Sequence, residues 1–152
     1  MKFKLLTLLI FLVSYLGFGQ NLNMVIEVNG KLVISGAFNL HFEYEDGTKE
    51  RISVGYEPGE LKLTESDWKK ISSDSTRSIR LTFNYDDFEK AKNQDSYYEI
   101  KMEKYHFNKR YLILRVYDFC ERKYRKKYGC LTNADYISEF NFPQGGILIS
   151  CG

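Results

Sequence analysis

FNLHFEYEDGTKERISVGY, residues 38–56, contains two alternating apolar and polar segments separated by Asp46-Gly47. A two-residue loop would pair His41 with Ile52 and mix apolar with charged side chains on each face. A three-residue loop at 46–48 separates the two kinds of side chain. Its pairs are Leu40 with Val54 and Phe42 with Ile52 on one face, and Glu43 with Arg51 and Glu45 with Lys49 on the other. Because a one-residue shift exchanges the faces, the sequence predicts an antiparallel hairpin with an odd-numbered loop.

The rest of the chain repeats this short-strand pattern. Asn29-Gly30 separates two apolar-rich segments and predicts a tight hairpin turn. The run YLILRVYDF, residues 111–119, has apolar groups on both faces and suits a central strand. Thr64 to Asp67 resembles a capping box, which predicts one or two helical turns over 65–71. About nine short strands and no long amphipathic helix predict an all-β, single antiparallel β-sandwich, immunoglobulin-like or transthyretin-like.

The N-terminus has the layout of a secretory signal peptide. Lys2 and Lys4 precede an apolar run from Leu5 to Leu16, and small residues follow it. The run is shorter than the roughly 20 residues that a membrane-spanning helix needs. We therefore expect residues 1–19 to be removed, residues 20–152 to form one domain, and the mature chain to be exported to the periplasm or medium without a transmembrane span.

Charge is balanced overall but unevenly distributed. Residues 1–19 hold two of the 22 basic residues and none of the 20 acidic ones, so the expected mature chain is formally neutral. Residues 101–152 contain ten basic and five acidic side chains, and residues 20–100 have the opposite excess. Nucleic-acid-binding domains usually have a strong basic excess, so we do not expect a nucleic-acid partner.

Three stretches resemble a group of known sequences. They are GYEPGELKLTESDWKKI at 55–71, YLILRVYDF at 111–119 with YRKKYGCL at 124–131, and DYISEFNFPQGG at 135–146. Together with Phe18-Gly19-Gln20 at the end of the leader, they look like small secreted proteins of uncharacterised function from Bacteroidota. The resemblance implies export and a β-rich fold, and it implies no activity.

CERKYRKKYGC, residues 120–130, is the most basic segment of the chain. Its candidate partner-binding residues are Arg122, Lys123, Tyr124, Arg125, Lys126, Lys127 and Tyr128. Cations interleaved with aromatic rings can hold an acidic protein or polysaccharide by charge and by stacking. The alternative is a solvated turn or a strand edge whose charges discourage pairing with other strands.

Three cysteines lie beyond the expected signal peptide: Cys120, Cys130 and Cys151. An oxidising compartment favours a disulfide, and a bridge from Cys120 to Cys130 would close the basic segment into a loop. The sequence also allows a bridge to Cys151 or no bridge.

Motifs for catalysis or cofactor binding are not recognisable. The sequence has no GxSxG elbow, no phosphate-binding glycine pattern and no CxxC spacing. His41, Glu43 and Glu45 share one strand face, which we interpret as a solvated face rather than a metal site. We therefore predict a secreted noncatalytic binding or scaffolding module of the cell envelope, without a cofactor or metal. The alternative is a small secreted hydrolase or a carbohydrate-binding module that uses Trp68, Tyr56 and Tyr97-Tyr98 as a platform.

Overall fold

Most of the described chain is in β-strands. The computed structural model describes residues 21–86, 96–129, 134–142 and 148–151. The strands are β1 Met24–Val28, β2 Lys31–Leu32, β3 Phe38–Tyr44, β4 Lys49–Glu57, β5 Glu60–Lys62, β6 Thr76–Tyr85, β7 Ser96–Met102, β8 Leu112–Asp118, β9 Tyr136–Asn141 and β10 Leu148–Cys151. The helices are α2 Glu65–Ser72, α3 Lys104–Phe107 and α4 Arg122–Tyr128. Nine strands are longer than the two-residue β2, so the predicted β-rich fold and strand number are confirmed.

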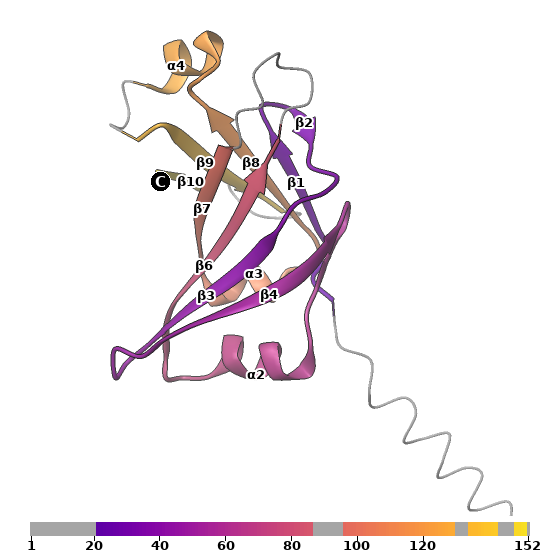
Figure 1. The fold of residues 1–152 in the computed structure, drawn as a ribbon, viewed down its shortest axis with the longest axis vertical. Coiled ribbons are helices and arrows are strands. Elements are labelled where there is room, and N and C mark those ends of the chain that lie inside the picture. The colour runs from indigo at the N-terminus through magenta and orange to yellow at the C-terminus, as the bar shows by residue number, and fades with distance from the viewer. Residues whose placement is uncertain (1–20, 87–95, 130–133, 143–147, 152) are drawn as a thin grey trace, which may run out of the picture.

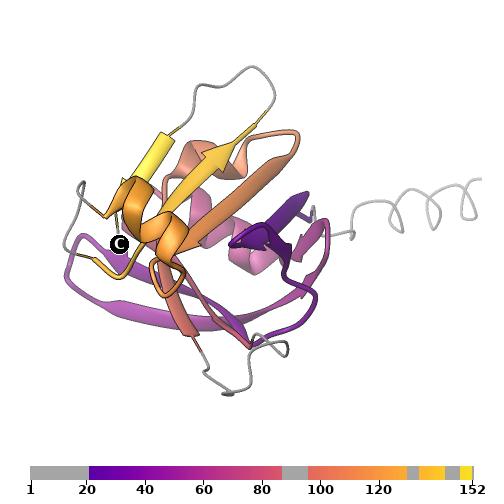
Figure 2. The same ribbon diagram turned by 90° about the horizontal axis from the view of Figure 1, so that it is seen from above.

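The strands form two sheets, visible as two layers in Figure 2. One has the order β5-β4-β3-β6-β7 and is antiparallel; the other has the order β10-β9-β8-β1-β2. In the second sheet β1 runs parallel to β8, with Met24 opposite Leu112 and Val28 opposite Val116. The prediction of a purely antiparallel fold was therefore wrong for this sheet. The position of β8 as the third of five strands confirms the predicted central strand.

The hairpin β3-β4 has the predicted odd-numbered loop but a different register. Leu40 lies opposite Ile52, not Val54, because the loop is Glu45–Gly47 instead of 46–48. The Tyr44 N–H donates to the Thr48 carbonyl at 2.9 Å, and Gly47 has a φ of +82°. A three-residue hairpin loop places a left-handed residue last, and glycine adopts that conformation at low cost. The register therefore shifts by two residues, which leaves the predicted apolar and polar faces unchanged.

A single cluster of buried hydrophobic side chains lies between the sheets. Phe38, Phe83 and Tyr98 form a stacked and tilted series at its centre, with ring centroids 5.3 and 5.4 Å apart. The hydroxyl of Tyr56 accepts a hydrogen bond from the Ile26 N–H at 2.9 Å, which links β4 to β1 through the interior. One shared core explains why two separate sheets fold as a unit.

Hydrogen bonds join the two sheets at their margins as well. Leu22, just before β1, exchanges backbone hydrogen bonds with Leu61 of β5 at 3.0 and 2.8 Å. On the other side, the Tyr136 hydroxyl of β9 accepts from the Glu99 N–H of β7 at 2.9 Å and donates to the Glu99 carbonyl at 2.8 Å. The described strands nevertheless form two sheets and not a closed barrel.

Two short helices close the end of the core shown at the bottom of Figure 1. The predicted capping box of α2 is present: the Thr64 hydroxyl accepts from the Asp67 N–H at 3.2 Å, and the Asp67 carboxylate accepts from the Thr64 N–H at 2.8 Å. Trp68 of α2 packs edge-on against Phe107 of α3 at 6.2 Å. No sequence pattern predicts α3, because its four residues are too few for a helical pattern.

Candidate functional site

Residues Arg122–Tyr128 of the basic segment form helix α4, so the predictions of a loop, a turn or a strand edge were wrong for these residues. Arg and Lys favour helices, and the cations lie along one exposed turn and a half. The Arg125 N–H donates to the Glu121 carbonyl at 3.1 Å, and the Gly129 N–H donates to the Arg125 carbonyl at 2.9 Å. The helix begins directly after β8 and lies at the top of the molecule in Figure 1.

Two tyrosines attach α4 to the sheet. Tyr124 and Tyr128 are four residues apart and therefore project from the same side of the helix. Both rings pack against Tyr117 of β8, with centroids 5.2 and 5.0 Å away. The Tyr117 hydroxyl in turn donates to the Glu139 carboxylate of β9 at 3.1 Å. Burial and the nearby Glu139 carboxylate raise the pKa of Tyr117 above its ordinary value, so the hydroxyl stays protonated as a donor.

The remaining side of α4 is the cationic side, which we define as Arg122, Lys123, Arg125, Lys126 and Lys127. All five residues are exposed. Within the described part of the chain, Glu121 is the only carboxylate paired with one of them, at 3.2 Å from Lys123. Lys123 and Lys127 lie over the rings of Tyr124 and Tyr128 at 4.5 and 4.8 Å. The same two tyrosines therefore anchor the helix and orient two of its cations.

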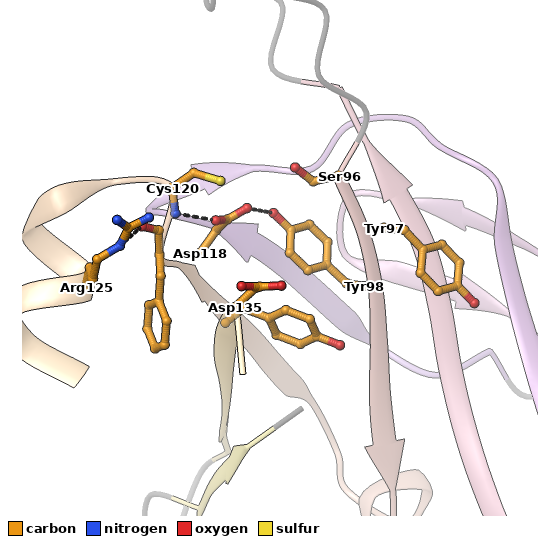
Figure 3. A pocket seen from close by; sticks show the side chains of 9 residues that line it. Ser96, Tyr97, Tyr98, Asp118, Cys120, Arg125 and Asp135 are labelled. Atoms are coloured by element: carbon orange, nitrogen blue, oxygen red, sulfur yellow. Dashed lines mark hydrogen bonds between the residues drawn. The ribbon is translucent and has the colours of Figure 1, made fainter. Parts of the chain in front are cut away.

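A pocket of about 350 Å³ lies beside the start of α4 (Figure 3). It is formed where β8 ends and β7 and β9 begin. Its lining residues are Ser96, Tyr97, Tyr98, Asp118, Phe119, Cys120, Arg125, Asp135 and Tyr136. The Arg125 Nε donates to the Phe119 carbonyl at 2.9 Å. Arg125 therefore belongs both to the cationic side of α4 and to the lining of the pocket.

Asp118 organises the floor of the pocket. Its carboxylate accepts from the Tyr98 hydroxyl at 2.6 Å and from the Cys120 N–H at 2.7 Å (Figure 3). Its backbone N–H donates to the Asn29 side chain at 2.8 Å. The pKa of Tyr98 is raised well above its ordinary value, first by burial and then by the hydrogen bond to Asp118. Asp118 therefore ties β8, β7 and the β1-β2 turn together, and these contacts suit a structural carboxylate more than a general acid.

The predicted disulfide involves residues outside the described ranges. Cys120 is exposed at the mouth of the pocket, whereas Cys130 is not among the described residues, and neither is the side chain of Cys151. Helix α4 separates Cys120 from Cys130, and its ends are about 9 Å apart along the axis at 1.5 Å per residue. A disulfide requires Cα atoms within roughly 7 Å. The pairing therefore stays a prediction.

The two histidines of the chain, His41 and His106, lie on separate elements, β3 and α3. His41 lies on the outer face of β3, and its Nε2 is 3.0 Å from the Thr82 hydroxyl. His106 is buried and stacked on Phe140, with ring centroids 4.1 Å apart. Neither histidine lines the pocket.

The proposed sugar platform is also dispersed. Tyr98 is buried, Tyr56 packs on Phe38 at 4.6 Å, and Trp68 lies on α2 against α3. Only Tyr97 of this group is strongly exposed. The structure therefore does not assemble these four rings into one surface.

The described residues contain no group of three or more His, Cys, Asp or Glu side chains placed to hold a metal ion. Among them, no helix has the length and apolar character required to cross a membrane. Comparison of the chain with protein-family models, with curated proteins and with solved structures found no match.

Proposed function

We propose that this protein is an exported, noncatalytic binding or scaffolding module of the cell envelope that contacts an acidic partner through the cationic side of α4. The observation that supports this function best is the attachment of five exposed cations to the sheet through Tyr124 and Tyr128. The expected signal peptide supports export, and the two facing sheets support a β-sandwich of the immunoglobulin-like or transthyretin-like kind. An acidic protein or polysaccharide is the proposed partner class.

The order and the charge of α4 both favour this contact. A flexible basic loop loses conformational entropy when it binds, whereas a helix packed on a sheet has already lost most of it. Five cations within six consecutive residues also create a local positive potential even though the expected mature chain is neutral. The contact is therefore expected to weaken with added salt, as exposed charge pairs do.

A charge-neutralised variant tests the proposed contact. Replacing the five cations of α4 with Gln is expected to weaken binding to a sulfated oligosaccharide or to a poly-glutamate peptide at least tenfold, about 1.4 kcal/mol. Isothermal titration calorimetry at low and moderate salt measures the change. The matched control removes five exposed cations elsewhere: Lys49, Lys62, Lys69, Arg77 and Arg110. Equal loss in both variants would mean that overall charge, not α4, determines binding.

A second variant tests the anchoring of the helix without changing its charge. Replacing Tyr124 and Tyr128 with Ala retains all five cations and removes both rings that pack on Tyr117. We expect faster amide hydrogen exchange in α4 and severalfold weaker binding, because the ring contacts with Tyr117 no longer hold this short helix on the sheet. Faster exchange with unchanged affinity would show that charge is sufficient and that the docked helix is not required.

A further inference from the structure

A second cationic feature lies on the opposite sheet. In register, Arg51 of β4 is opposite His41 of β3, His41 is opposite Arg80 of β6, and Arg80 is opposite Lys101 of β7. These four residues, the cationic row, therefore lie side by side across four strands. Residues in register share one face of a sheet, and neighbouring strands are about 4.8 Å apart. The row is separate from α4, which packs on the other sheet.

Like charges directly opposite one another destabilise a sheet unless something neutralises them. Arg80 donates to the Glu99 carboxylate at 2.9 Å, and Lys101 pairs with Glu103 at 2.9 Å. Within the described residues no carboxylate is paired with Arg51, which is exposed. The Arg80 Nε, moreover, is buried without a hydrogen-bond partner. Arg51 therefore retains an exposed positive charge that no carboxylate of the described residues neutralises.

His41 lies between the two arginines with one ring nitrogen engaged. Its Nε2 is 3.0 Å from the Thr82 hydroxyl, so Nδ1 is the nitrogen left for another partner. Burial lowers the pKa of His41, Arg51 and Arg80 lower it further, and Glu99 of β7 opposes them. Glu43, two residues along β3, is another carboxylate on this face. Burial and the two arginines therefore both disfavour the protonated imidazole, and an external anion would offset the effect of the arginines.

We propose that Arg51, His41 and Arg80 form a binding site for a tetrahedral oxyanion, a sulfate or phosphate group, on the outer face of β4, β3 and β6. Register places these three side chains next to one another on three neighbouring strands. A tetrahedral anion offers an oxygen to each of them, whereas a carboxylate offers only two oxygens. Arginine side chains at either side suit such groups because the guanidinium presents its N–H donors in a planar fork.

Linkage gives the site a specific pH dependence. A bound anion stabilises the protonated imidazole, so the pKa of His41 is higher in the complex than in the free protein. By reciprocity, affinity for the anion increases as pH falls through the titration range of His41. Protonated His41 then donates through Nδ1 to the anion while Nε2 donates to Thr82.

Proton NMR of the two histidines tests the site in the intact chain. Titrating pH with and without inorganic sulfate, at ionic strength matched with chloride, is expected to raise the pKa of His41 by about half a unit, saturably. His106 is an internal standard because it is buried beneath Phe140 and does not face the row. No shift of His41, or the same shift in chloride, would overturn the proposal.

Matched variants separate the site from general charge. Arg51→Gln and Arg80→Gln are expected to abolish the sulfate-induced shift. Arg77→Gln removes an exposed cation from the same strand β6 outside the row and should retain it. If Arg77→Gln also abolished the sulfate-induced pKa shift of His41, overall charge would explain the shift. An equal pKa shift with acetate would contradict selectivity for a tetrahedral anion. Neither result bears on α4, whose binding is measured separately.

Discussion

The Tyr98→Phe variant is expected to lose about 2 kcal/mol of unfolding free energy, the cost of removing a donor from a buried charged group. The Tyr98 hydroxyl donates to the Asp118 carboxylate at 2.6 Å, and both residues are buried. Phe keeps the ring that packs on Phe83 and Tyr136 at 5.4 and 5.1 Å, so little packing is lost. Stability is lost because a buried carboxylate oxygen of Asp118 no longer receives the hydrogen bond from residue 98.

Urea unfolding of the wild type and the variant measures this difference. Tyr97→Phe is the matched control, since Tyr97 is the neighbouring residue on β7 and its side chain is 56% exposed. That control should change stability by less than about 0.5 kcal/mol. Equal stability of Tyr98→Phe and the wild type would show that Asp118 does not depend on this hydrogen bond.

Acid is expected to destabilise the protein through His106 by up to about 3 kcal/mol. Burial lowers the pKa of His106 from 6.5 to about 4. Its Nδ1 accepts from the Glu103 N–H at 3.0 Å, and its Nε2 is buried without a partner. The unfolded chain thus binds this proton more readily. The contribution of neutral His106 to the unfolding free energy is complete above pH 6.5 and is lost as pH falls from about 6.5 to 4.

Unfolding free energies measured between pH 7 and pH 4 test this dependence. In His106→Asn, the amide oxygen replaces Nδ1 as the acceptor and nothing titrates at this position. We expect lower stability at pH 7 and a smaller decrease toward pH 4 than in the wild type. His41→Asn is the control and should retain the steep decrease, because His41 lies on the sheet surface. Identical pH profiles of wild type and His106→Asn would contradict the assignment.

Sequence patterns predicted the local features of this fold well. The faces of β3 and β4 follow from alternation alone, and Asn29-Gly30 forms the expected turn with φ values of +54° and +80°. The capping residues of α2 are adjacent in sequence, so their pattern is visible without a structure. The register error arose because Gly47 was placed inside the loop rather than at its left-handed last position.

Long-range features were not predictable in the same way. Parallel pairing of β1 with β8 joins residues 88 positions apart, and no turn signal links them. Helix α4 was missed because the two rings that pack it on the sheet, Tyr124 and Tyr128, contact Tyr117 of β8, and this contact is not visible in the sequence. The pocket depends on the meeting of three strand ends, and its Asp118–Tyr98 contact has no signature in the sequence. The cationic row likewise requires the register of four strands.

The hydrogen bonds between Tyr136 and Glu99 have a consequence for association between molecules. β7 is the last strand of its sheet, and its outward N–H and C=O groups recur at every second residue. Glu99 is the middle of the outward-facing positions of β7. The Tyr136 hydroxyl is hydrogen-bonded to both its N–H and its carbonyl oxygen. A strand from another copy would have to displace this ring before it could extend the sheet. Tyr136 therefore protects the β7 edge from pairing with a strand of another molecule.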